Sequence, residues 1–114
     1  MWFFKRKNKT EQLLNNKHHI EAMAASIDVL ISLGQENEEL VATLKAIQDK
    51  IKYFNPSDKS DVLDLDKKIE NKLGDLKIDI TKAKQKGEYA NALSLANEIK
   101  DVLVVERNAK ANLR

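Results

Sequence analysis

The chain has 114 residues, of which 42% are hydrophobic and 33% are charged, and its formal net charge is +2. This length supports one hydrophobic core and not two independent ones, and the apolar content excludes a chain that is disordered throughout. The absence of cysteine excludes disulfides and thiolate metal sites, and no apolar run approaches the roughly 20 residues that span a bilayer.

The first nine residues form an arm whose composition differs from that of the rest of the chain. Three aromatic residues, half of the six in the chain, are followed by four cations with no acidic residue among them. These residues are Trp2, Phe3, Phe4, Lys5, Arg6, Lys7 and Lys9. The other residues include 16 basic and 18 acidic side chains and are therefore slightly acidic. We divide the chain into an arm over residues 1–9 and a single helical domain over residues 10–114.

The first predicted helix runs from about Thr10 to Leu33. Thr10 is a suitable N-cap, and Glu11 lies in the first turn, where the helix dipole favours an anion. Gly34 follows Leu33 directly, so we expect it to close the helix in the left-handed conformation. Apolar residues recur at helical spacing and predict one buried face: Leu13, Ile20, Met23, Ala24, Ile27, Leu30 and Ile31.

The second predicted helix runs from about Glu36 to Phe54. Glutamates lie near its start and lysines near its end, as the helix dipole favours. Asn55 and Pro56 end the helix, because the residue before proline is disfavoured in helical geometry. The apolar residues are spaced by four and three in turn, which is typical of a helical bundle: Leu40, Leu44, Ile47, Ile51 and Phe54.

The third predicted helix ends at about Lys86, and the sequence leaves its start open. Asn55 as the cap of a helix that begins at Pro56 and Ser60 as the cap of a later start both fit the pattern. The apolar residues pass through Gly74 without losing phase, so we expect one continuous helix. A bend or break at Gly74 is the alternative, because glycine costs roughly 1 kcal/mol relative to alanine inside a helix. The stripe comprises Val62, Leu65, Ile69, Leu73, Leu76, Ile80 and Ala83.

The fourth predicted helix follows Gly87, which we expect to end the third, and runs from Glu88 to about Asn112. Arg107 and Lys110 lie in its closing turns, where cations complement the helix dipole. The apolar stripe comprises Tyr89, Leu93, Ala96, Ile99 and Leu103, broadened by Ala92, Leu95, Val102 and Val105.

Four amphipathic helices with short connections predict an all-α fold, an up-down-up-down antiparallel four-helix bundle. The same pattern permits two helical hairpins that complete their core by dimerisation. None of the polar residues has an obvious place in the interior of either arrangement.

The histidines do not form a metal site in the sequence pattern. His18 and His19 are adjacent and therefore point about 100° apart on a helix, whereas two-histidine helical sites need a spacing of four. His18 and Glu21 supply at best half a site. We therefore expect no metal and no other cofactor.

The acidic residues of the third helix also fall short of a site. Asp61, Asp64, Asp66 and Glu70 lack the glycine and glutamate positions that an EF-hand loop requires. We interpret Asp66 and Glu70 as part of a solvated face. Since no carboxylate or histidine is expected in a pocket, we predict no catalytic residue and no enzymatic activity.

These features predict a non-catalytic, cytoplasmic interaction or adaptor protein that presents a helix face or its arm to a protein partner or to a second copy. One alternative is a peripheral membrane module, with the rings of residues 2–4 at the lipid headgroups and the cations of the arm on anionic lipid. A second alternative is a nucleic-acid accessory factor that stacks bases on Trp2 or Phe3. The acidic body and the scarcity of arginine argue against this second alternative. No small-molecule substrate is evident.

Overall fold

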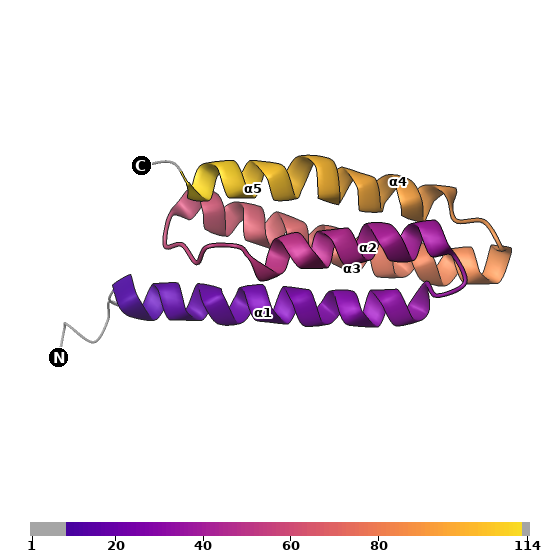
Figure 1. Ribbon diagram of the computed structural model, residues 1–114, viewed down its shortest axis with the longest axis horizontal. Helices are drawn as coiled ribbons and strands as arrows, with labels where there is room; N and C mark the ends of the chain where they lie inside the picture. The colour runs from indigo at the N-terminus through magenta and orange to yellow at the C-terminus, as the bar shows by residue number, and fades with distance from the viewer. Residues whose placement is uncertain (1–8, 113–114) are drawn as a thin grey trace.

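The computed structural model describes residues 9–112, and for Lys9 the backbone only. These residues form α1 (Lys9–Leu33), α2 (Glu38–Lys52), α3 (Ser60–Lys86) and one further continuous helix. That helix consists of α4 (Ala90–Glu98), the π-helical turn η2 (Ile99–Leu103) and α5 (Val104–Ala111). Successive helices alternate in direction (Figure 1), so the predicted all-α, up-down-up-down four-helix bundle is confirmed.

The helices are arranged with α1 and α4–α5 at the two outer edges and α2 and α3 between them (Figure 1). α1 packs against α2 and α3, and α4 packs against the same two helices. α2 and α3 therefore lie diagonally across the bundle, although they follow each other in the chain. Short connections predicted the alternating directions but not this choice of neighbours.

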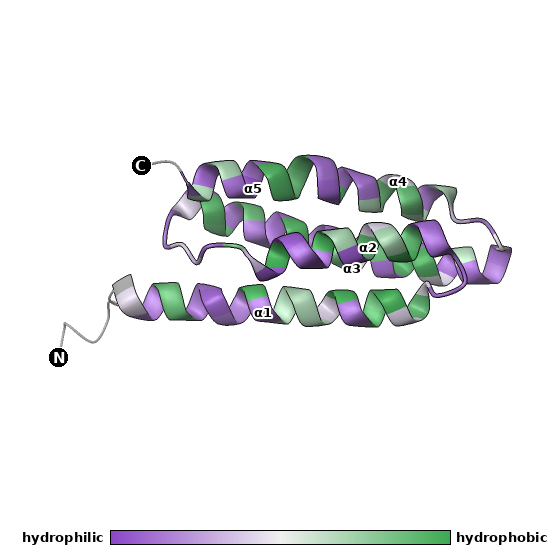
Figure 2. Ribbon diagram, viewed as in Figure 1, coloured by the Kyte–Doolittle hydropathy of each residue, from purple (hydrophilic) through white to green (hydrophobic). Residues whose placement is uncertain are grey.

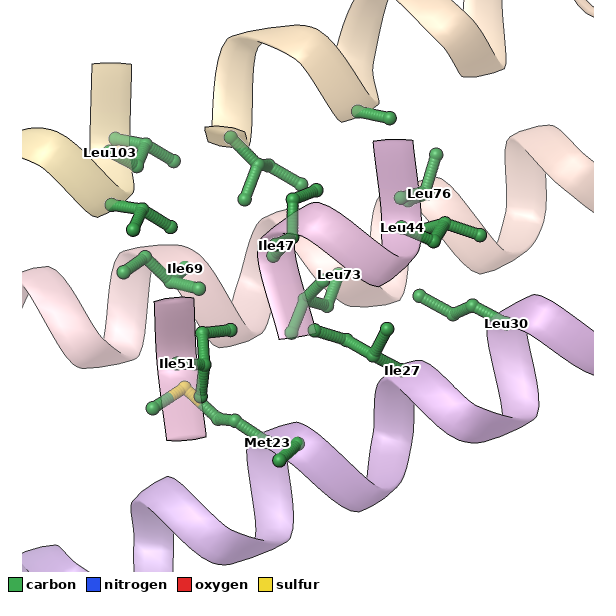
Figure 3. Close-up of a cluster of buried hydrophobic side chains, with 14 of the residues drawn as sticks. Met23, Ile27, Leu30, Leu44, Ile47, Ile51, Ile69, Leu73, Leu76 and Leu103 are labelled. Carbon is green, nitrogen blue, oxygen red and sulfur yellow. The ribbon is translucent and has the colours of Figure 1, made fainter. Parts of the chain in front are cut away.

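One hydrophobic cluster joins all four helices. Hydrophobic and hydrophilic residues alternate along each helix at about the spacing of the helical turn (Figure 2). The hydrophobic side chains of different helices meet in the interior (Figure 3). Residues with no exposed surface come from every helix and include Ile27, Leu44, Ile47, Ile69, Leu76 and Ile99. One chain thus closes its own core, and dimerisation of two hairpins is not required for it.

The glycines confirm two sequence predictions and correct one. α3 continues through Gly74, and Gly87 adopts the predicted left-handed conformation with φ of 72°. Gly34, however, does not have a positive φ. Its small size leaves room for a neighbour, because a Cβ atom there would lie 2.8 Å from Cδ2 of Leu40 and that side chain would have to shift.

Four predicted helix boundaries shift in the structure. α2 begins at Glu38 because the side chain of Asn37 accepts a hydrogen bond from the backbone N–H of Leu40 at 2.9 Å, and it ends two residues before Phe54. α3 takes the later of the two predicted starts, with Lys59 rather than Ser60 at the N-cap position. The fourth helix begins at Ala90, two residues after its predicted start.

Alanine should have opposite effects at two of the glycines. We expect Gly74→Ala to raise the free energy of unfolding by about 1 kcal/mol, because no atom lies within 4 Å of the added Cβ position and alanine favours the helix. We expect Gly87→Ala to lower the free energy of unfolding by about 1–2 kcal/mol, since an L side chain is strained at its φ. Urea denaturation followed by circular dichroism measures both, and equal signs would contradict this assignment.

Candidate functional site

The predicted interaction arm falls almost wholly outside the described residues. This applies to Trp2, Phe3, Phe4, Lys5, Arg6 and Lys7. Lys9 is the first residue of α1, and its side chain is not described. The role of the arm therefore stays a prediction.

A buried ion pair lies at the end of the bundle where α3 begins and α5 ends. Arg107 of α5 has no exposed surface, and Asp66 of α3 is 1% exposed. Arg107 Nε donates to Asp66 Oδ1 at 2.9 Å, and Nη1 donates to the backbone carbonyl of Asn55 at 2.7 Å. The guanidinium carbon lies 4.4 Å from the ring centroid of Phe54, at a distance typical of a cation–π contact.

Asn16 of α1 completes this cluster. Its Oδ1 atom accepts hydrogen bonds from Arg107 Nη2 at 3.1 Å and from the backbone N–H of Ser57 at 3.0 Å. Its Nδ2 atom donates to Asp66 Oδ2 at 2.7 Å. We call Asn16, Asp66 and Arg107 the polar cluster. It joins α1, α3, α5 and the connection over residues 53–59 at one point.

The polar cluster corrects two sequence predictions. Asp66 is not part of a solvated face, and the interior does contain charged residues. The sequence held a signal for Asp66, which follows Val62 by four residues and precedes Ile69 by three, so it shares their buried face. Arg107 likewise follows the buried Leu103 by four residues, but its inward orientation also depends on the π-helical turn that precedes it.

The turn η2 changes which residues of the fourth helix face the core. The N–H of Val104 donates to the carbonyl of Ile99, five residues earlier rather than four, which adds one residue to the turn. Beyond this turn Val104 and Arg107 are buried. Val102 and Val105, predicted to broaden the apolar stripe, are instead 53% and 51% exposed.

The polar cluster is fully hydrogen-bonded and closed to solvent. No buried side-chain nitrogen or oxygen atom in the described part of the chain lacks a hydrogen-bond partner. Since Arg107 and Asp66 are also closed to solvent, neither presents a free donor, acceptor or charge to a substrate.

The two histidines, which the sequence did not predict to form a metal site, have different surroundings in the structure. His18 lies on the surface, whereas Nε2 of His19 lies 3.0 Å from Oε2 of Glu70 on α3. Within residues 9–112, no group of three or more potential ligands is placed to hold a metal ion.

A contact between two connections occurs at the other end of the bundle. The Tyr89 hydroxyl lies 3.4 Å from Oε2 of Glu36 and donates to it. Partial desolvation and the negative charge of Glu36 raise the pKa of Tyr89 above its ordinary value. This contact links the α1–α2 connection to the α3–α4 connection.

A groove of about 340 Å³ lies between α1 and α3. Met23, Leu30 and Leu73, all nearly buried, contribute to its lining. The α1 side adds His19, Ala22, Ser26 and Val29, and the α3 side adds Glu70, Gly74 and Lys77. The groove is mainly apolar at its base and carries opposite charges along its α3 rim.

The outward side of α1 next to this groove carries few charges. From His18 to Leu33 the helix contains no lysine or arginine, and its only acidic residues are Glu21 and Asp28, both exposed. Its exposed residues here include the small or apolar set Ala22, Ala25, Ser26, Val29 and Ser32, which we call the α1 outer face. Val29, the largest side chain of this set, is 50% exposed. The sequence contained this signal, since the apolar residues of α1 are not confined to one stripe.

Comparison with protein-family models, with curated proteins and with solved structures finds no match for this chain. None of the helices within residues 9–112 is long and apolar enough to cross a membrane.

Removing the Arg107 charge should strongly destabilise the fold. We expect Arg107→Met to lower the free energy of unfolding by about 3–5 kcal/mol, because it leaves the Asp66 carboxylate buried without its partner. Adding Asp66→Leu should recover at least half of this loss, since both charges are then gone. Urea denaturation measures both variants, and a loss below about 1 kcal/mol for Arg107→Met would show that the pair is not the constraint described here.

Proposed function

We propose that this protein is a non-catalytic, cytoplasmic interaction module that binds a protein partner on the α1 outer face and in the adjoining groove. The observation that carries this proposal is the absence of lysine and arginine from His18 to Leu33, where Glu21 and Asp28 are the only acidic residues. A surface helix normally places charged residues opposite its buried stripe. The outward side of α3 does so with Lys67, Asp75 and Lys82, all exposed. The α1 outer face consists of uncharged residues, and the exposed charges beside it are the acidic side chains of Glu21 and Asp28.

The groove beside this face supports the same proposal. Gly74 lies in the middle of α3, where glycine is unfavourable, and beyond its own turn of backbone no atom of residues 9–112 lies within 4 Å of the position that its Cβ would take. Packing within the described residues therefore gives no reason for a glycine there. Together with Ala22 and Ser26 on α1, it leaves room for the backbone of a partner. Binding of an amphipathic helix in a two-helix groove is a common mode of recognition.

Substitutions on the α1 outer face should remove the partner without unfolding the bundle. We expect Ala22→Arg and Val29→Arg each to weaken capture of the main partner from the source cell by about tenfold or more, because a charge would be buried in the contact. Ala42→Arg, on the exposed side of α2, is the matched control and should capture as the unchanged chain does. Equal recovery of the partner by all three variants would exclude this face.

A vesicle experiment separates this proposal from the membrane alternative for the arm. We expect the full chain and its triple variant Trp2→Ala, Phe3→Ala, Phe4→Ala to be equally unbound in flotation with anionic vesicles. Binding by the full chain that the triple variant loses would favour an anchor in the arm, since the rings supply the apolar contact with the headgroup region.

A further inference from the structure

The fourth helix contains one residue more before Arg107 than a regular α-helix would place there. Ala92, Ala96, Ile99 and Leu103 follow the spacing of one buried stripe, and a regular α-helix would continue this stripe to Glu106 and Lys110. The residue that is buried instead is Arg107. Beyond η2, each inward position is thus occupied by the residue one place later in the chain than in a regular helix. The π-helical turn η2 accommodates the extra residue.

The charge that meets Asp66 differs between the two registers. With η2 present, Arg107 lies against Asp66, while Asn16 and the carbonyl of Asn55 supply the other contacts at this site. Without η2, a regular helix would direct Glu106 to the same point. Two carboxylates would then share a site closed to water, which is strongly unfavourable.

We propose that the α4–α5 helix is a two-register element, with and without η2, and that the charge facing Asp66 selects the register. Loss of η2 would rotate α5 by about 100° relative to α4, the angle of one residue. Val104 would turn from the interior toward the surface, and the face that α5 presents would change. This device is independent of the α1 outer face, so its test does not depend on the proposed function.

Exchanging the two charges tests the proposal directly. Arg107→Glu alone places an acid beside Asp66 in both registers and should abolish cooperative thermal unfolding. The double variant Glu106→Arg, Arg107→Glu has the same net charge as the unchanged chain and can pair with Asp66 only by losing η2. We expect the second substitution to restore cooperative unfolding.

A single introduced thiol reports the register, because the chain has no cysteine of its own. Val104→Cys replaces a residue with no exposed surface, so its thiol should react slowly with a soluble thiol reagent in the unchanged background. In the charge-exchanged background we expect reaction at least about tenfold faster, equivalent to about 1.4 kcal/mol. Val105→Cys, at a position that is 51% exposed, should react rapidly in both backgrounds and is the control.

Two results would overturn the proposal. One is a charge-exchanged variant that is as unfolded as Arg107→Glu. The other is a folded charge-exchanged variant in which the thiol of Val104→Cys stays protected.

A deletion tests the register without moving a charge. Removing Asp101 from η2 should leave a regular helix that still directs Arg107 inward, so we expect a folded protein. Removing Asn71, an exposed residue inside the regular helix α3, is the control and should abolish the fold, because no π-helical turn can absorb the shift. Equal loss of structure in the two deletions would contradict a register that η2 can adjust.

Discussion

The buried pair of Arg107 and Asp66 is the constraint on which the arrangement of the helices depends. Apolar stripes pack in many ways, because contact between aliphatic side chains has little directional preference. A buried charge has few solutions, since each of its donors needs an acceptor. Here the solution requires α1, α3, α5 and the connection over residues 53–59 at one point. We interpret the polar cluster as the reason why α2 and α3 can lie diagonally across the bundle.

Two departures from a simple amphipathic pattern therefore have different meanings. Charges inside the bundle are explained completely by contacts within the chain. The uncharged α1 outer face, with the open groove beside Gly74, has no explanation within residues 9–112. Features that a chain does not need for its own stability are expected at functional sites. This contrast is why we interpret the polar cluster as structural and propose recognition for α1.

The sequence allowed the class of fold to be predicted, because spacing of apolar residues is a property of each helix alone. It gave the four helices, the left-handed turn at Gly87 and the continuity of α3 through Gly74. It did not give the inward orientation of Arg107, since that depends on Asp66, 41 residues away, and on an extra residue in the helix. The burial of Asp66 could have been predicted from its helical spacing. It was missed because acidic residues were expected to be solvated. The candidate site on α1 likewise had a signal in the absence of basic residues, but its position beside a groove required the packing of α3.

Hydrogen exchange at the backbone amide of Ser57 tests the central claim most directly. Ser57 lies in a connection outside any helix, yet its N–H donates to the buried side chain of Asn16 at 3.0 Å. If the polar cluster holds this connection against the bundle, the Ser57 amide should exchange as slowly as the most protected core amides. Its exchange would then require global unfolding. Exchange at the rate of an exposed loop amide would show that the connection opens independently, and would contradict the account.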